Sequence, residues 1–480
     1  MPTRRDFLGY GLSGAAGLLA LRNPSAWAQS GDAAPAPDPD FEGRMLLPGD
    51  EGFESARQNI LKNPRTDNHP AAVAYCKSEA DVVRCLRFAG NEGLPVAPRS
   101  GGHSMVGWGT CDDGVVVDTS SMRTMSVDHE KRSIKVGAGV LSAELGAFVA
   151  QHDLAAVVAQ CPTVGVAGLM LGGGLGYLSG LYGATCDTLL EADLVTADGQ
   201  LVTCNANEHP DLFWAIRGGG GNFGILTSMT FQLFPVARFL TGRISYAFAD
   251  ARRVLQLFSE VMANAPDALQ GWAGLTQADG HYYVDLGFSW AGSTAEGENA
   301  LRPFREIAKP VSNTMHWGGF VDTFSIYPPA AEFPNYAAMS GSYVQRLTDE
   351  VIDVAIERIQ SAEGGFSSNI GFDHYMHGAI SRVDPRATAF ELRGEGAAHV
   401  WIPANWNDPA AGAAALEWVD ETWHALSAYS GGRSYVNYPA FRETQRNGLA
   451  YSQNRERLQS IKMAYDPGNV FQQNYNIAAI

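Results

Sequence analysis

The short motifs that mark the commonest cofactor and metal sites are missing from this sequence. It has no H-E-x-x-H or similar ligand spacing, and its six cysteines form no C-x-x-C pair, so neither a metal site nor thioredoxin-like chemistry is predicted. It also has no G-K-[ST], which argues against a P-loop. The glycine run 172–176 fails G-x-G-x-x-G in both registers, because Tyr177 and Ser179 occupy the final positions. A Rossmann dinucleotide site is therefore not predicted.

Positive charge and long apolar runs are scarce as well. The chain has 34 Lys and Arg against 51 Asp and Glu, a formal charge of −17. This balance disfavours binding to nucleic acid or to anionic lipid. The weakly apolar run 9–21 is too short and too rich in glycine to span a membrane. We therefore expect a small-molecule substrate as partner, no nucleic acid and no membrane insertion, while the oligomeric state stays open.

The N-terminus has the features of an export signal. Residues 3–8 (T-R-R-D-F-L) form a twin-arginine pattern, the apolar run follows, and Ala26-Trp27-Ala28 gives an A-x-A cleavage site. The sequence thus predicts a twin-arginine signal peptide over 1–28 and a Pro- and Ala-rich flexible leader over 29–45. The twin-arginine export machinery would then be a partner, and the protein would be periplasmic or secreted. This route carries folded proteins, which suits a protein that loads its cofactor before export.

Strand and helix patterns alternate along the rest of the chain and predict an α+β fold. In the first half we expect strands at 71–75, 96–97, 115–118, 133–136 and 154–158, helices at 78–92 and 140–152, and a hairpin of 190–196 with 201–204 around Asp198-Gly199. In the second half, alternating segments 271–275 and 281–290 predict an antiparallel sheet, with helices at 351–361 and 451–463. We expect domains at 46–237 and 238–430 and a C-terminal segment at 431–480.

Two glycine-punctuated segments each offer a nucleophilic side chain. In P-R-S-G-G-H-S (98–104), small residues let backbone N–H groups converge on an anion such as a pyrophosphate, and His103 lies beside them. In Q-C-P-T-V-G-V (160–166), Cys161 precedes a proline and residues small enough to admit a planar ligand. Alone, the first segment also fits an ordinary tight turn, and a lone cysteine is more often buried and structural. Their joint occurrence favours one ligand site.

Together with further motifs, these segments resemble the berberine-bridge-like branch of the vanillyl-alcohol-oxidase family of FAD enzymes. The resemblance runs from about residue 70 to 477 and includes L-G-G-G-x-G from 171, Y-G-x-x-x-D from 182, D-L-F-W-A-I-R-G-G-G-G-N-F-G from 211 and Y-D-P-x-N-x-F from 465. It implies an exported bacterial member with a two-part PCMH-type FAD-binding domain over 46–237. It also implies a substrate domain whose antiparallel sheet is covered by helices, and a C-terminal segment that returns to the FAD domain.

The resemblance also implies where the cofactor would be held. FAD would be bound bicovalently, with His103 on the flavin 8α-methyl carbon and Cys161 on ring C6. Two such bonds would make the ring a better hydride acceptor and fix its angle to the substrate. The other implied cofactor-binding residues are Arg99, Ser100, Gly101, Gly102, Ser104, Thr163, Val164, Gly165, Gly168, Gly172, Gly173, Gly174, Gly176, Asn222, Gly224, Ile225, Asn469, Asn474 and Asn476.

For catalysis, Tyr435-x-Asn437 resembles the family's Y-x-N segment, whose tyrosine takes the substrate hydroxyl proton. On a strand, Tyr435 and Asn437 would share a face. A phenol with a pKa near 10 needs a nearby cation or hydrogen-bond donor to act as a base at neutral pH. The alternative to a catalytic role is that Tyr435 is an aromatic residue packed in the core of a sheet. His399 and Trp401 share a face where relatives often have a cation and Gln, Glu or Tyr. Trp401 accepts no proton, so we expect Tyr435 to be the catalytic base and His399 to adjust its pKa.

The function predicted is an FAD-dependent oxidase that moves hydride from an alcohol to flavin and reduces O2 to H2O2. Val164 matches members that admit dioxygen, whereas Leu169 stands where many relatives have a histidine near the flavin. A dehydrogenase with a non-oxygen acceptor and a non-catalytic flavin-binding protein are the alternatives. Oligosaccharides, alkaloids, polyketide glycosides and phenylpropanoid alcohols all stay open as substrates.

Overall fold

The computed structural model describes residues 40–235, 238–327, 333–374, 376–394, 397–441 and 451–478. The predicted signal peptide and leader residues 29–39 therefore lie outside the described residues. The end of the predicted leader already belongs to the fold, because Arg44–Leu46 forms strand β1. Across the described ranges, no helix combines the length and the apolar character that crossing a bilayer requires.

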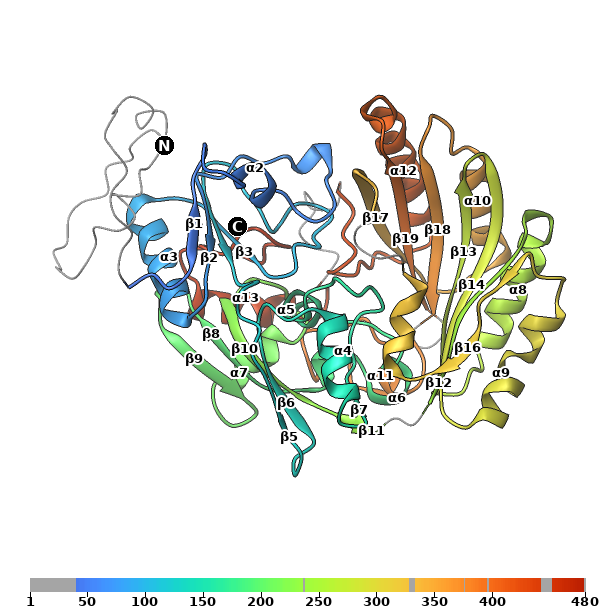
Figure 1. The fold of residues 1–480 in the computed structure, drawn as a ribbon, viewed down its shortest axis with the longest axis horizontal. Coiled ribbons are helices and arrows are strands. Elements are labelled where there is room, and N and C mark those ends of the chain that lie inside the picture. Colours follow the sequence, from blue (N-terminus) through green and yellow to red (C-terminus); the bar gives the residue numbers. More distant parts are fainter. Residues whose placement is uncertain are drawn as a thin grey trace.

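The first half of the chain builds two small sheets, to the left in Figure 1. One has the order β1-β2-β4-β3, with β2 (Ala72–Tyr75), β4 (Val115–Asp118) and β3 (Val96–Arg99) parallel. The other is antiparallel in the order β5-β6-β10-β8-β9, with bounds Met125–Asp128, Ser133–Gly137, Ile225–Gln232, Leu189–Val195 and Leu201–Asn205. The strands predicted at 71–75, 96–97, 115–118 and 133–136 and the 190–204 hairpin are confirmed, and Gly199 takes the positive φ of 77° that its turn requires.

Helices of the first half begin and end where local chemistry favours it. In α3 (Glu79–Glu92), the Ser78 hydroxyl accepts from the Asp81 N–H at the start, and left-handed Gly93 ends the helix. The others are α2 (Phe53–Ala56), α4 (Ser142–Ala150), α5 (Val166–Leu171), α6 (Ser179–Tyr182) and α7 (Pro210–Ile216). The strand predicted at 154–158 is wrong beyond Ala155. Only β7 (Leu154–Ala155) pairs, with β11 (Phe234–Pro235), and the buried chain then runs unpaired towards Cys161.

The second half forms one large antiparallel sheet, which confirms the predicted fold class. Its order is β15-β12-β14-β13-β18-β19-β17, and β16 pairs with β12. The strands are β12 (Phe239–Ala247), β13 (Leu269–Ala278), β14 (His281–Ala291), β15 (Ser312–Asn313), β16 (His316–Gly318), β17 (Tyr336–Val344), β18 (Ser367–His374) and β19 (Ala398–Trp406).

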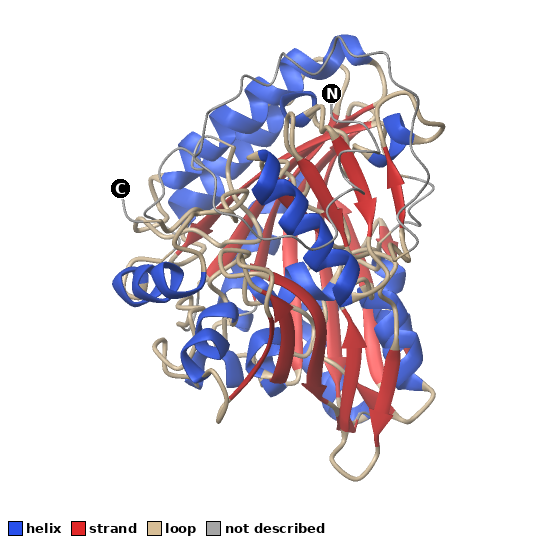
Figure 2. Cartoon of the chain, turned by 90° about the vertical axis from the view of Figure 1, so that its left-hand side faces the viewer, coloured by secondary structure: helices blue, strands red, loops and turns tan. Residues whose placement is uncertain are grey.

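Helices cover the outer face of this sheet. They are α8 (Ala251–Met262), α9 (Thr294–Glu306), α10 (Asp349–Gln360) and α12 (Gly412–Ser427), on the right in Figure 1; short α11 spans Ala379–Arg382. The turned view shows long strands through the molecule with helices around them (Figure 2). Along β19, Val400 and Ile402 are buried in the helix-covered core, while Trp401 and Pro403 lie on the opposite face. The inner face therefore meets the first half of the chain.

The C-terminal segment lies against the first half again (Figure 1). Helix α13 (Arg455–Tyr465) packs on α7, and buried Lys462 donates from Nζ to the backbone oxygens of Asn222 and Phe471. The predicted helix start at 451 is wrong by four residues. The Glu391 carboxylate accepts the N–H groups of residues 452 and 453, so a side chain holds this backbone outside the helix.

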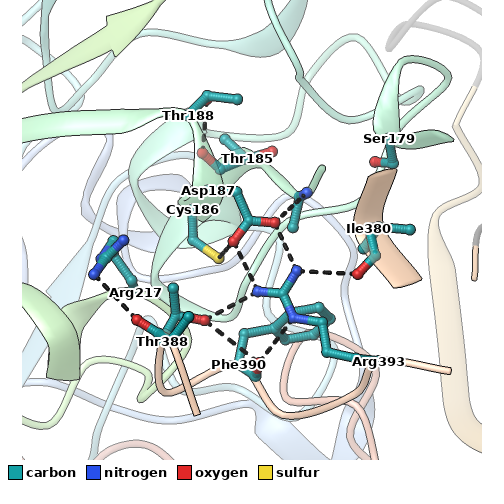
Figure 3. Close-up of polar contacts among 12 residues, drawn as sticks. Ser179, Thr185, Cys186, Asp187, Thr188, Arg217, Ile380, Thr388, Phe390 and Arg393 are labelled. Carbon is teal, nitrogen blue, oxygen red and sulfur yellow. Dashed lines mark hydrogen bonds and ion pairs between the residues drawn. The ribbon is translucent and has the colours of Figure 1, made fainter. Parts of the chain in front are cut away.

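A buried ion pair between Arg393 and Asp187 joins the two halves of the chain (Figure 3). Arg393 donates from Nη1 and Nη2 to the two carboxylate oxygens of Asp187 at 2.6 and 2.7 Å, and its guanidinium lies 4.9 Å over the Phe390 ring. Phe390 in turn fills the space beside Gly173, where a Cβ would lie 2.5 Å from the ring. Breaking such a buried bidentate pair typically costs about 3–5 kcal/mol. The pair therefore fixes the segment 388–393 against the glycine run.

Candidate active site

A cavity of 490 Å³ lies between the two halves of the molecule. Its first wall consists of the loops 98–104 and 159–172 with residues 220–226, and its second wall comes from 333–339, β19 and 435–439. The predicted site residues that line it are Arg99, Ser100, Gly101, Gly102, His103, Ser104, Cys161, Val164, Gly165, Gly168, Gly172, Gly224, Ile225, Asn474, Tyr435 and Asn437. Those outside the lining are Thr163, Gly173, Gly174, Gly176, Asn222, His399, Asn469 and Asn476.

The loop after β3 is locked against the loop that carries the cysteine. Arg99 ends the strand and donates from Nε to Asp118 Oδ2 at 2.5 Å, with both side chains buried. The Ser100 hydroxyl donates to the Ala138 carbonyl at 2.6 Å. A Cβ on Gly101 would lie 2.4 Å from the backbone nitrogen of Gly165, so the two loops touch backbone to backbone. Glycine is needed at both positions because no side chain fits between them.

His103 and Cys161 meet at one hydroxyl group. Nε2 of His103 lies 2.6 Å from Thr163 Oγ1, and the Cys161 sulfur lies 3.5 Å from the same oxygen. Burial lowers the pKa of His103 to about 4, so its imidazole is neutral at pH 7. Burial also raises the pKa of the Cys161 thiol, which the Thr163 hydroxyl and N–H partly oppose. The arrangement presents two nucleophilic side chains, one of them a neutral imidazole, to one cavity.

The first wall has the bare backbone that a large cofactor with phosphates requires. Gly168 and Gly221 line the cavity, and a Cβ on either would meet no atom within 4 Å, so both present backbone to open space. Asn474 donates to the Gly221 carbonyl, but its buried Oδ1 has no partner among the described residues. An orphaned acceptor beside bare backbone fits a ligand with hydrogen-bond donors. The same described residues contain no cluster that could hold a metal ion.

Of the remaining asparagines, Asn222 and Asn476 have local structural partners, whereas the buried Oδ1 of Asn469 has none among the described residues. Asn222 is buried and donates to the backbone oxygens of Gly219 and Tyr475. Asn469 is left-handed, with φ 50°, in the turn after α13. The Asn476 side chain accepts the N–H of residue 478. Direct contact of these three with a cofactor stays a prediction.

Tyr435 lies in a turn, so it does not belong to a strand on which Tyr435 and Asn437 would share a face. The N–H of Tyr438 closes the turn on the Tyr435 carbonyl at 2.9 Å, which takes the segment out of any sheet. Tyr435 and Asn437 nevertheless meet, because Asn437 Nδ2 donates to the phenol oxygen at 3.1 Å. The Gly174 N–H donates to the same oxygen at 3.2 Å. Burial raises the pKa of Tyr435 well above its usual value, and these two donors oppose that rise.

His399 packs behind Tyr435 rather than in the cavity. The two ring centroids are 4.6 Å apart, and neither ring nitrogen of the buried His399 has a hydrogen-bond partner in the described structure. Burial lowers the pKa of His399 to about 3, so this imidazole is neutral at pH 7. His399 therefore supplies no positive charge to Tyr435.

Asp373 is a buried carboxyl group that the sequence did not single out. It accepts from the Trp401 indole N–H at 3.2 Å, and burial raises its pKa to about 8. It pairs with His399 across β18 and β19. The available signal was alternation: Ile370 and Phe372 face the helix-covered core, so Asp373 must point the other way, towards the cavity side.

The second wall is aromatic and largely apolar. The Trp401 indole lies over Gly371, where a Cβ would be 2.1 Å from the ring, and it meets Trp272 edge to face at a centroid distance of 6.0 Å. Glycine opposite tryptophan leaves the indole room to lie flat on the sheet. The apolar members of this wall are Phe333, Pro334, Ala337, Ala338, Met339, Trp401, Pro403, Val436 and Pro439.

Two family models match this chain: "FAD binding domain" over residues 70–205 and "Berberine and berberine like" over 434–478. Among curated proteins it is similar to the uncharacterized FAD-linked oxidoreductase YgaK of Bacillus subtilis, with 29% identity over 89% of this chain and 95% of that one. It is also 38% identical to (R)-6-hydroxynicotine oxidase of Paenarthrobacter nicotinovorans, over 43% of this chain and 45% of that one.

Solved structures share the whole fold. The 6-hydroxy-D-nicotine oxidase of Arthrobacter nicotinovorans superposes with a TM-score of 0.81 and 26% identity, covering 91% of this chain and 98% of that one. The glucooligosaccharide oxidase of Acremonium strictum superposes with a TM-score of 0.80 and 22% identity, covering 91% of this chain and 97% of that one. At this identity, the similarity shows a shared fold. The FAD of that enzyme is described as 6-S-cysteinyl, 8α-N1-histidyl FAD.

Proposed function

Because this chain is an FAD-linked oxidoreductase of the berberine-bridge-like family, we propose that it oxidises an alcohol and reduces dioxygen to hydrogen peroxide. FAD, when bound, supplies the acceptor for the hydride that leaves the carbinol carbon. The cavity between the two walls would hold the cofactor on its glycine side and the substrate on its aromatic side. The cofactor and the enzyme class are established by the similarity, whereas the donor, the acceptor and the site residues are our proposal.

The observation that carries the proposal is the convergence of His103 and Cys161. Both side chains line one cavity, and both contact the Thr163 hydroxyl, so one flavin can be reached by both nucleophiles. We propose that His103 and Cys161 hold FAD bicovalently, as the name of the Acremonium strictum enzyme describes for that protein. Val164 lines the same cavity, which supports access of dioxygen.

Tyr435 is the proposed base for the substrate hydroxyl. Its oxygen accepts from Asn437 and from the Gly174 N–H, so a phenolate there would keep two donors while it takes up the proton. Burial and the absence of a charged imidazole work against ionisation at neutral pH. We therefore expect substrate oxidation to accelerate as the pH rises towards the phenol pKa.

The composition of the second wall bears on the substrate. The Asn437 amide of this wall is already engaged, because it donates to the Leu169 carbonyl, and on the first wall Gln160 accepts from Tyr327. Among the described residues of this wall, none is Lys, Arg, Asp or Glu. An oligosaccharide would leave many hydroxyl groups without partners there, so we propose a planar alcohol with few hydroxyls that lies on Trp401.

The same site could pass electrons to an acceptor other than dioxygen, and peroxide yield under air separates the two activities. The motif around Arg4 and Arg5 supports export in the folded state, which places the proposed oxidase in the periplasm or outside the cell.

An anaerobic screen of alcohols that follows loss of flavin absorbance tests the proposal. With a substrate that bleaches the flavin, Tyr435→Phe is expected to slow reduction by about 10²- to 10⁴-fold, the usual contribution of a general base. Tyr438→Phe is the matched control, because this neighbouring ring lies 5.3 Å from Tyr435. Reduction of Tyr435→Phe at the wild-type rate would remove Tyr435 as the base. Failure of all alcohols to bleach a flavin that dithionite reduces would favour a non-catalytic flavin-binding protein.

A further inference from the structure

We propose that the Thr163 hydroxyl is a positioning group for both covalent bonds: it accepts from Nε2–H of His103, which leaves the lone pair on Nδ1, and it donates to the Cys161 sulfur. The proposal rests on the proposed bicovalent attachment and assigns a role to a residue that does not itself line the cavity. It follows from how one hydroxyl is shared between two nucleophiles.

The histidine contact determines which ring nitrogen can act as a nucleophile. A neutral imidazole has one N–H and one lone pair, and the partner of one nitrogen decides which form is present. Nε2 lies 2.6 Å from Thr163 Oγ1, within hydrogen-bonding distance. Among the described residues, this is the hydrogen bond that the ring makes. With Nε2–H as donor, Nδ1 carries the free lone pair of this cavity-lining side chain.

The cysteine contact completes the assignment. A hydroxyl can accept two hydrogen bonds and donate one. If its oxygen accepts from Nε2–H, its own proton is free to point at the Cys161 sulfur, 3.5 Å away. A donor to sulfur favours the thiolate, which is the nucleophilic form, against the opposing effect of burial. One orientation of the Thr163 hydroxyl thus prepares both side chains.

The attachment chemistry balances with dioxygen as oxidant. Forming each bond joins Nδ1 or sulfur to carbon and releases two protons, one from the carbon and one from Nε2–H or the thiol. The two electrons that are also released reduce one dioxygen to hydrogen peroxide. Thr163 accepts the N–H that must lose its proton in this step, so its oxygen lies on the path by which that proton leaves.

The test isolates the histidine bond. In a Cys161→Ser background, His103 is the single attachment point, and holoprotein is prepared with Thr163, Thr163→Ser or Thr163→Val. Intact mass gives the fraction of chains that carry FAD, and digestion with characterisation of the released histidyl-flavin identifies the linked nitrogen. Neither measurement needs substrate turnover, so its result does not depend on whether the alcohol screen finds a substrate.

We expect Thr163→Val, which replaces the hydroxyl with a methyl group of similar size, to slow attachment about tenfold or to give a mixture of Nδ1 and Nε2 linkages. Thr163→Ser keeps the hydroxyl and should restore full attachment at Nδ1. The same three Thr163 forms are then compared in a His103→Ala background, where Cys161 is the single attachment point. Attachment of FAD to Cys161 should again be faster with threonine or serine at position 163 than with valine. Complete Nδ1 attachment in Thr163→Val at the parental rate would overturn the proposal. Should the valine variant not fold, Thr163→Ala is compared with Thr163→Ser in the same way.

Discussion

The two walls of the cavity are built on opposite principles. On the first wall the backbone defines the shape, and glycines such as Gly101 and Gly165 allow two loops to touch directly. On the second wall side chains define the shape, and Trp401 lies flat over Gly371 on a regular sheet. Backbone geometry requires particular residues at particular positions, whereas a side-chain surface can be made in many ways. This difference agrees with our proposal that the first wall holds the cofactor and the second wall contacts the substrate.

The first wall should respond sharply to a single methyl group. Gly101→Ala places a Cβ 2.4 Å from the Gly165 nitrogen, and we expect a loss of about 3 kcal/mol or more in unfolding free energy, with loss of bound FAD. The measurement is urea denaturation together with flavin content. Gly168→Ala is the matched control, because its Cβ would meet nothing within 4 Å and alanine favours helix α5.

Gly168→Ala should thus fold as well as wild type or better, yet retain less FAD because the methyl group enters the cavity. Equal destabilisation by both substitutions would contradict the view that only the loop contact requires glycine. Full flavin content in Gly168→Ala would show that the cofactor does not approach this backbone.

This contrast explains which parts of the site could be predicted from the sequence. The segments around His103 and Cys161 were recognisable because tight turns, positive φ and close approach restrict the residues allowed there. The second wall has no such restriction. Asp373 lies in β18, and its pairing with His399 and its bond to Trp401 depend on the register between β18 and β19, which local periodicity does not specify.

The errors in secondary structure have a related cause. Tyr435 and the start of α13 are held by long-range contacts, namely the Gly174 N–H and the Glu391 carboxylate. Local periodicity contains no information on such partners. The strand order of the large sheet was beyond the sequence for the same reason, although its antiparallel character followed from alternation.

Asp373, which accepts from the Trp401 indole of the second wall, makes the stability of the protein depend on pH. Its pKa rises from about 3.9 in the unfolded chain to about 8 in the fold, so the folded protein binds the extra proton between these values. Stability from this group is therefore full below pH 4 and is lost as the pH rises towards 8, by at most about 1.4 kcal/mol per pH unit. We expect Asp373→Asn to equal wild type near pH 4 and to be the more stable protein at pH 8.

Urea denaturation across this pH range measures the difference between the two proteins, which removes contributions from other groups. Asp285 offers a control in the same sheet, because its buried carboxylate accepts from the hydroxyls of Ser245 and Thr276. Asp285→Asn loses these charge-assisted bonds and should not gain stability at pH 8. A pH-independent difference for Asp373→Asn would show that this carboxyl ionises normally.

The smallest effect should come from the recognition surface itself. Trp401→Leu removes the aromatic platform but keeps an apolar side chain, so a flat ring loses stacking while a saturated ring loses little. We expect the rate of anaerobic flavin reduction at low substrate to fall about three- to tenfold for 2-naphthalenemethanol and to change little for cyclohexylmethanol. Trp317→Leu is the control, since Trp317 lies on β16 away from the cavity lining. If cellobiose reduced the wild-type flavin faster than the naphthyl alcohol, the proposal of a planar substrate would be wrong. The proposal of alcohol oxidation would still hold. An equal loss for both alcohols in Trp401→Leu would mean that this indole supports the shape of the second wall rather than contacting the ring.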